Sequence, residues 1–520
     1  MKKNRLNLVL VGMLILVMFV TACSSKSGAP KESATTEPVV TAKATEKATV
    51  APKLEPVELS YYFPGTPQKD MPEVEAAINK ILKEKINATI KLNLIDWGSF
   101  EQKINVMSAA GENYDLVFTA PWMNNYYQNV AKGALTPMDE LLDKYAPKLK
   151  ATVPAKIWDA TRVDGKIYGA INWQIVAMPY GVAVAKDLAD KYKLDLAKVN
   201  KYEDMEAFFE QIAKNEKGVT AMSFTNTYDI FSGQSPYFGM DSIGEDASPG
   251  WYYLNKPDVK VVNQFASAEF KQFVDLMYKW NKKGYIRKDA ASITDSTADM
   301  KAGKYASAIA FPTKPGGEAE LATRYGKEFI AKALSKPLIT TGRAIATMTG
   351  ISKKSKNPER AMMFLELINS DKNLYNLLAH GIEGKHFVVK DKEKGVIGLP
   401  DGVKAENVGY NPGTDWMFGN QFNGYYASSG DVGNWEKTIQ LNMDGVNSNL
   451  LGFNFNPEPI KTELAQSASV VKQYIFALTS GTVDPDKFLP EFLDKLNKAG
   501  VDKIITEKQK QIDEWTKTKK

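Results

Sequence analysis

The side chains that could perform acid–base, nucleophilic or metal chemistry are few in this chain. It has two histidines, His380 and His386, and one cysteine, Cys23. A single cysteine excludes an intramolecular disulfide and a cysteine metal cluster, and two histidines are too few for a histidine-rich zinc site. The motifs of a nucleophile elbow, a zinc-protease helix, a Walker A loop, a Rossmann turn and an EF-hand loop are absent from the sequence. An enzyme would therefore have to work with carboxylates alone, as glycosidases can.

Aromatic residues that lie close in sequence to amide or carboxylate side chains are more numerous than groups for nucleophilic or metal chemistry. Such rings stack under the C–H faces of sugars, and the polar groups hydrogen-bond the sugar hydroxyls. We expect a site of this kind to hold no metal and no cofactor. For any single tryptophan, core packing is an equally good interpretation. The candidate rings are Phe63, Trp97, Trp122, Trp173, Tyr237, Trp251 and Trp416, and the candidate polar partners are Asp96, Asn172, Gln174, Asp415 and Asn420.

Three of these rings follow predicted strands near the start of the chain. Residues 57–63, 89–95 and 115–119 have strand patterns, and residues 70–82 and 100–110 between them have apolar side chains at helical spacing. This β-α-β-α-β order predicts a parallel sheet with right-handed crossovers. Ligands of such sheets bind at the carboxyl ends of the strands, so we expect a binding edge there.

A long apolar stretch, residues 163–185, predicts a passage between two lobes. Gly169, Pro179 and Gly181 divide it, and it is long enough for at least two buried strands. Residues 172–174 would then lie where the chain leaves one α/β lobe and enters the second. A cleft between lobes is a common place for small ligands to bind.

The second lobe and the return to the first are read from the residues that follow. The loop 226–251, with Tyr237 and Trp251, is expected to line the cleft from the other side. Residues 338–348 are expected to cross back. Arg343 in that segment could hold a carboxylate bidentately, as in a uronate-bearing sugar. A structural ion pair at the hinge is the alternative.

The length, net charge and composition of the chain are those of an ordinary globular protein with an N-terminal leader. The chain has 520 residues, which suggests two or three domains. Lys2, Lys3 and Arg5 supply three units of the formal net charge of +5, so no case exists for nucleic acid. With the apolar run 8–20 they form a signal-peptide pattern. Residues 24–56 lack aromatic residues and are rich in Thr, Ala, Lys, Glu, Pro and Ser, which predicts an unfolded tether.

Several of these segments resemble one family. Val20-Thr-Ala-Cys23 is similar to a lipobox. The stretches Gly165-Lys-Ile-Tyr-Gly169, 133–142 and 300–311, and the helix opened by Asn357-Pro-Glu359, resemble extracellular solute-binding proteins of ABC importers, of the carbohydrate type. The resemblance of 300–311 implies that Phe311 and Thr313 stand at another edge of the cleft. The C-terminal part resembles an uncharacterised domain of lipoproteins that serve oligosaccharide importers.

The resemblance implies a fold and a function. The fold is α/β, a periplasmic-binding-protein type II fold of two lobes joined by a hinge, with extra C-terminal helices. The expected parts are a signal peptide at 1–22, a tether at 23–56, lobe 1 at 57–175 and 345–400, and lobe 2 at 176–344 and 401–520. A monomer with a lipid on Cys23 would bind an oligosaccharide outside the cell membrane and deliver it to permease subunits. A carboxylate-based glycan hydrolase or lyase, and a binder of peptides or other non-sugar solutes, remain alternatives.

Overall fold

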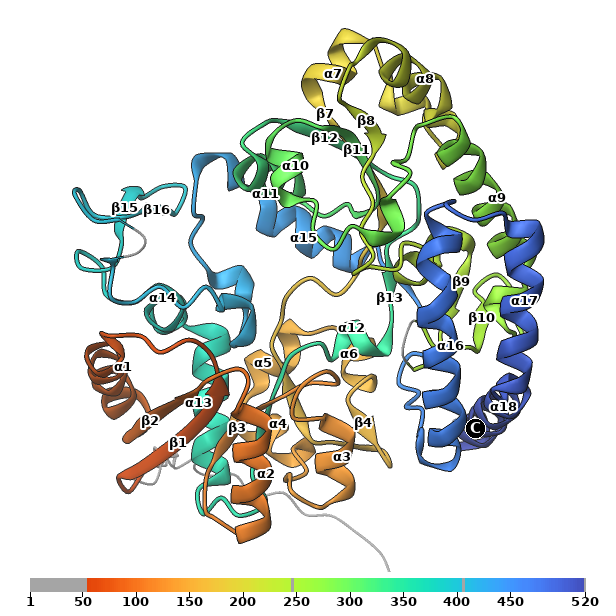
Figure 1. The fold of residues 1–520 in the computed structure, drawn as a ribbon. Coiled ribbons are helices and arrows are strands. Elements are labelled where there is room, and N and C mark those ends of the chain that lie inside the picture. The colour runs from red at the N-terminus through yellow and green to blue at the C-terminus, as the bar shows by residue number, and fades with distance from the viewer. Residues whose placement is uncertain (1–53, 245–246, 405–406, 519–520) are drawn as a thin grey trace, which may run out of the picture. The chain divides into compact units, whose positions relative to one another are not determined.

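The computed structural model describes residues 54–244, 247–404 and 407–518 (Figure 1). The predicted signal peptide, most of the predicted tether and the lipidation site Cys23 lie outside the described residues. Within the described ranges, no helix combines the length and apolar character needed to cross a bilayer.

The first lobe is built on the predicted parallel sheet, extended by two strands from later in the chain. The strand order is β2-β1-β3-β14-β6, with β1 parallel to β2 and β3, and β14 antiparallel to β3 and β6. The β-α-β-α-β prediction is therefore confirmed. The strands are β1 (Val57–Pro64), β2 (Ala88–Ile95), β3 (Leu116–Thr119), β6 (Gly169–Ile171) and β14 (Met348–Ile351).

Helices surround this sheet because one face of each is apolar. Helix α1 buries Val74, Ile78 and Leu82 at spacings of four residues. The first-lobe helices are α1 (Met71–Ile86), α2 (Phe100–Ala110), α3 (Tyr126–Ala131), α4 (Asp139–Tyr145), α5 (Pro147–Thr152), α6 (Ala155–Asp159), α13 (Pro358–Ser370) and α14 (Lys372–His380).

The second lobe has a four-stranded sheet of mixed direction. The order is β12-β7-β11-β8, with β7 antiparallel to both neighbours and β11 parallel to β8. Helix α9 (Ala268–Lys282) is capped by Ser267, whose hydroxyl accepts from the Phe270 N–H. The helix buries Phe273 and Met277. The strands are β7 (Tyr180–Ala185), β8 (Thr220–Met222), β11 (Tyr305–Pro312) and β12 (Phe329–Ala333).

The remaining elements cover this sheet, join the lobes or form small ladders. The helices are α7 (Lys186–Lys191), α8 (Glu206–Asn215), α9 (Ala268–Lys282), α10 (Thr297–Lys301), α11 (Gly317–Tyr325), α12 (Thr341–Ala344), α15 (Asn434–Met443), α16 (Lys461–Thr479), α17 (Pro485–Lys498) and α18 (Val501–Thr518). The short strands are β4 (Arg162–Val163), β5 (Lys166–Ile167), β9 (Met240–Ser242), β10 (Trp251–Tyr253), β13 (Leu338–Ile339), β15 (Val388–Asp391), β16 (Val396–Gly398) and β17 (Val446–Asn447).

The predicted boundary between the lobes at residue 400 needs a correction. Tyr410, Met417 and Phe418 are buried in the core of the first lobe, not the second. The Phe418 ring lies edge-on to Phe63, with 5.2 Å between ring centroids. The C-terminal helices α16 and α17 do pack with the second core, through residues such as Ile475 and Phe492.

The first crossing is the segment between β6 and β7, where the chain passes from the first lobe to the second. Its backbone groups form hydrogen bonds with segments far along the chain. The Trp173 N–H donates to the carbonyl of Gly419 at 2.6 Å. The Asn442 side chain on α15 accepts from the N–H groups of Val176 and Ala177, at 2.9 and 3.1 Å, and donates to the Gln174 carbonyl at 2.8 Å. The segment 419–442 therefore supplies the acceptors for Trp173, Val176 and Ala177 in the chain between β6 and β7.

Replacing Asn442 by Ala should destabilise the protein by about 2 kcal/mol or more, because two buried N–H groups would lose their acceptor. Thermal unfolding of the two proteins measures this. The matched control is Gln440→Ala, which removes an exposed amide of the same helix and should change stability by less than about 0.5 kcal/mol. Equal melting temperatures for Asn442→Ala and the wild type would contradict the role assigned to Asn442.

Candidate ligand-binding site

Three tryptophans meet at the edge of the first-lobe sheet where its parallel strands end. Trp97 follows β2 and Trp122 follows β3, whereas Trp416 lies on a 3₁₀ turn, Asp415–Met417. The Trp416 ring centroid is 6.3 Å from that of Trp97 and 6.2 Å from that of Trp122, at interplanar angles of 25° and 49°. All three rings are partly exposed, and 51% of Trp122 is accessible. The predicted binding edge therefore carries a cluster of exposed rings.

Local hydrogen bonds set the directions of two of these side chains. The Asp96 carboxylate accepts from the Gly98 N–H at 2.9 Å, and the Asp96 carbonyl accepts from Phe100 at the start of α2. This tight turn holds Trp97 at the edge. The Trp122 indole N–H donates to the Ala346 carbonyl at 2.7 Å, next to β14. The Trp122 side chain is therefore tied to the segment 338–348, in which the chain returns to the first lobe.

Polar groups lie beside the tryptophan cluster. The Gln174 amide nitrogen donates to the Thr347 hydroxyl at 2.8 Å, and that hydroxyl lies 3.3 Å from the Trp416 carbonyl. No described residue donates to the Gln174 side-chain oxygen, which leaves it available to a ligand hydroxyl. The Asp415 carboxylate accepts from Gln421, and the Asn420 side chain accepts from the Phe422 N–H. These last two therefore shape the loop that carries Trp416.

Arg343 lies on α12, within the segment 338–348 in which the chain returns to the first lobe. This segment is the second crossing. Its guanidinium carbon is 5.8 Å from the centre of the Tyr180 ring, and one terminal nitrogen donates to the Tyr180 hydroxyl. Among the described residues, no carboxylate lies within 4.0 Å of Arg343, so the alternative of a structural ion pair at the hinge does not hold there. The charge is half-buried and without a described counter-charge.

The structure removes two rings from the candidate set. Phe63 is 2% exposed and packs against Phe418 in the first core. Trp251 is fully buried in the second core and stacks on Phe231, with 5.2 Å between centroids and 3° between planes. Both rings are enclosed by apolar side chains, because they lie on inward faces of their lobes. Neither ring has a face that a ligand could reach.

The residues of the first crossing divide into structural and accessible ones. Asn172 is buried, and its side chain donates to the Met417 carbonyl at 2.6 Å and accepts from Thr349. Trp173 is 4% exposed and lies edge-on to Phe422. Asn172 and Trp173 are therefore removed from the candidate ligand contacts of the segment 172–174, and Gln174 remains a candidate.

Tyr237 also has a structural role. Its ring stacks on Tyr202 at 4.1 Å, and its hydroxyl accepts from the Tyr202 N–H at 3.1 Å. Burial raises the pKa of Tyr237 to about 12, so the phenol stays neutral. The ring is partly exposed, yet the stacking face is occupied by Tyr202.

The two histidines serve the fold. His386 is buried, accepts from the Ile382 N–H at 2.8 Å through Nδ1, and places Nε2 3.2 Å from the Asp70 carboxylate. Hydrogen bonds from Lys385 and His386 lower the pKa of Asp70, which precedes α1. Burial lowers the pKa of His380. Within the described ranges, no group of three or more His, Cys, Asp or Glu side chains is placed to hold a metal.

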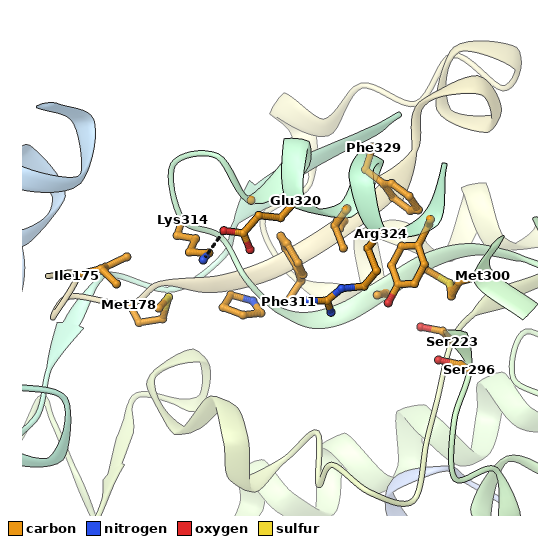
Figure 2. A pocket seen from close by; sticks show the side chains of 16 residues that line it. Ile175, Met178, Ser223, Ser296, Met300, Phe311, Lys314, Glu320, Arg324 and Phe329 are labelled. Carbon is orange, nitrogen blue, oxygen red and sulfur yellow. Dashed lines mark ion pairs between the residues drawn. The ribbon is translucent and has the colours of Figure 1, made fainter. Parts of the chain in front are cut away.

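A cavity of about 370 Å³ lies in the second lobe (Figure 2). Phe311, Met300 and Arg324 line it, and Ile175 and Met178 of the first crossing stand at one end. The stretch 300–311, which resembles the family, predicts Phe311 at a cleft edge but assigns no role to its first residue, Met300, and Arg324 belongs to no motif. Their contribution follows from how α10 and α11 lie over the sheet.

Comparisons with known proteins agree with this architecture. The family model described as bacterial extracellular solute-binding protein matches residues 66–374, and a domain of unknown function matches residues 449–517. A carbohydrate ABC transporter substrate-binding protein of Streptococcus pneumoniae serotype 4 is 30% identical over 467 residues, which are 89% of this chain and 91% of that protein.

Solved structures point the same way. The crystal structure of the N-glycan transport solute binding protein NgtS from Streptococcus pneumoniae aligns with a TM-score of 0.77 and 28% identity, covering 89% of this chain and 100% of that one. The same protein in complex with Man5GlcNAc aligns with a TM-score of 0.63 over 89% of this chain and 99% of that one, again at 28% identity. The fold is the two-lobed type II binding-protein fold, and the chain belongs to the bacterial extracellular solute-binding proteins.

Proposed function

We propose that this protein captures an oligosaccharide in the cleft between its lobes and delivers it to the permease of an ABC importer. The observation that carries the proposal is the cluster of Trp97, Trp122 and Trp416 at the ligand-binding edge of an α/β sheet. The carbohydrate substrate-binding relative and the NgtS complexes with Man1GlcNAc and Man5GlcNAc support the sugar as ligand.

The geometry suggests how binding would work. Exposed indole faces stack under the C–H faces of sugar rings, and the Gln174 oxygen accepts from a hydroxyl. A sugar that touches both lobes binds the closed arrangement more tightly than the open one, so its differential affinity drives closure. The closed form is what a permease would recognise. In this proposal the protein changes no covalent bond of the sugar.

The first test is a calorimetric and thermal-shift panel of neutral oligosaccharides and peptides. A bound ligand at 100 times its Kd should add about 2.7 kcal/mol of stability. Trp122→Ala should weaken oligosaccharide binding about tenfold, because an exposed stacking platform is lost, while its melting temperature changes little.

The control is Phe488→Ala, an exposed aromatic residue on α17, which should leave affinity unchanged. Mass spectrometry of the same mixtures should return the sugars intact. Binding of peptides and not sugars, or the appearance of cleavage products, would favour one of the alternatives and refute the proposal.

Arg343 supports a more specific ligand, an oligosaccharide bearing a uronate. Its guanidinium has no described carboxylate partner, so a sugar carboxylate would meet an uncompensated cation. Arg343→Ala should weaken binding of a uronate-bearing oligosaccharide at least tenfold and of a neutral one of equal length much less. Arg343→Lys should restore only part of the loss, because lysine cannot bind a carboxylate bidentately. Unchanged affinity for acidic sugars would remove this specificity.

We also propose that a diacylglycerol on Cys23 anchors the protein outside the cell membrane. The support is the sequence around Cys23, which resembles a lipobox after a signal-peptide pattern. Cells labelled with a palmitate analogue should yield a labelled membrane-bound protein, and Cys23→Ala should abolish the label and move the protein out of the membrane fraction. Retention of Cys23→Ala in washed membranes without label would contradict the anchor.

A further inference from the structure

Small side chains line the base of the cavity in the second lobe. Ala183 of β7 and Ala308 of β11 are directly paired across the sheet, and both line the cavity. Helices α10 and α11 contribute the walls through residues such as Met300 and Leu321. Two small side chains opposite one another leave a hollow that larger residues would fill.

A β-bulge decides which side chain closes this hollow. The pairing of β11 with β7 is regular to Ile309 opposite Val182, and the next pair is Phe311 opposite Gly181, so Ala310 has no partner. Side chains of a regular strand alternate between faces, so residues three positions apart, such as Ala308 and Phe311, would face opposite sides of the sheet if the strand had no bulge. The bulge puts Phe311 on the cavity face, beside a glycine that adds no side chain.

The bulge is held by a buried hydrogen-bond network. Ala310 has a φ of +57°, which is unfavourable for a residue with a Cβ. Its N–H donates to the Tyr202 hydroxyl at 3.3 Å, and that hydroxyl donates to the Gln234 side chain. The Tyr202 ring stacks on Tyr237. Backbone strain of this kind persists only where the surrounding structure imposes it.

The lining combines apolar and hydrogen-bonding groups. Phe311, Met300 and Phe329 supply apolar surface, and Ser223 and Ser296 supply hydroxyls. Arg324 at the rim has no ion pair within the described ranges, whereas Lys314 and Glu320 pair with each other at 2.6 Å.

This lining is more apolar than the hydroxyls of a plain hexose require. An acetamido group fits it better, because its methyl group suits the apolar wall and its carbonyl accepts from a hydroxyl or guanidinium. Ile175 in the lining directly follows Gln174 at the tryptophan cluster, so one oligosaccharide could extend from one to the other.

We propose that this cavity is a second sugar subsite, which takes an N-acetylated hexose unit over the Phe311 ring, and that Tyr202 is the positioning residue that sets the ring through the Ala310 bulge. The proposal rests on the proposed function, since it assumes that the chain binds oligosaccharides. It adds a specificity that the tryptophan cluster does not provide.

Calorimetry with two probes tests the subsite, an N-acetylglucosamine trimer and a mannose trimer. Phe311→Ala should weaken binding of the N-acetylated trimer at least tenfold more than binding of the mannose trimer. Trp122→Ala should weaken both, and Phe488→Ala neither. Equal effects of Phe311→Ala on the two probes, or none, would overturn the subsite while leaving the proposed function standing. A wild type that binds neither trimer would overturn the subsite, and it would overturn the proposed function only if the whole oligosaccharide panel, acidic sugars included, also failed to bind.

Tyr202→Phe tests the positioning role, because it removes the hydroxyl and keeps the stacked ring. It should reduce affinity for the N-acetylated trimer several-fold, leave the mannose trimer unchanged and speed hydrogen exchange at the Ala310 amide. Tyr305→Phe is the control, another buried hydroxyl removed from β11 itself. A Tyr202→Phe protein with a lower melting temperature but an unchanged ratio of the two affinities would overturn the positioning role.

Discussion

The need to satisfy buried N–H groups at the first crossing governs much of this structure. Between β6 and β7 the backbone leaves one sheet before it joins the next, so the amides of Trp173, Val176 and Ala177 lie outside both main sheets. Buried amides without partners are costly. The partners come from Gly419 and the side chain of Asn442, which brings the segment 415–447 against the crossing.

That requirement also assembles the candidate site. The loop that pairs with Trp173 carries Trp416 a few residues earlier, and this ring completes the cluster begun by Trp97 and Trp122. The hydrogen bond from Trp122 to Ala346 links the cluster to the second crossing, near Arg343 in sequence. In the proposed function, this shared use of segments would couple binding to lobe movement, since a ligand on the tryptophan cluster would act on the segments that join the lobes.

The polar chemistry of the molecule is divided between support and recognition. His386 with Asp70, and Tyr202 with Gln234, are buried networks whose members satisfy one another. Gln174 and Arg343 differ from them, because each keeps hydrogen-bonding capacity that no described residue uses. Groups of the first kind rigidify a fold, whereas groups of the second kind are what a polar ligand can engage.

The sequence alone determined the elements whose signals are local. Helical spacing in 70–82 and 100–110, strand patterns around them and the turn residues between them predicted the first sheet and the positions of Trp97 and Trp122 at its edge, and the segments resembling the family predicted two lobes. The lobe boundary predicted at residue 400 does not hold, because Tyr410 and Phe418 pack in the core of the first lobe. These contacts join distant segments, so no local sequence pattern indicates them.

Only the tertiary structure decided which aromatic residues remain accessible. Phe63, Trp251, Trp122 and Trp416 are all aromatic residues that the sequence offers as candidate ligand contacts. Whether each ring is buried depends on which distant segments pack over it. The face of Phe311 depends on one unpaired residue, Ala310, held by Tyr202 across the lobe. Residue type and periodicity are properties of a short stretch, whereas exposure, register and hydrogen-bond supply are set by partners far away in the sequence.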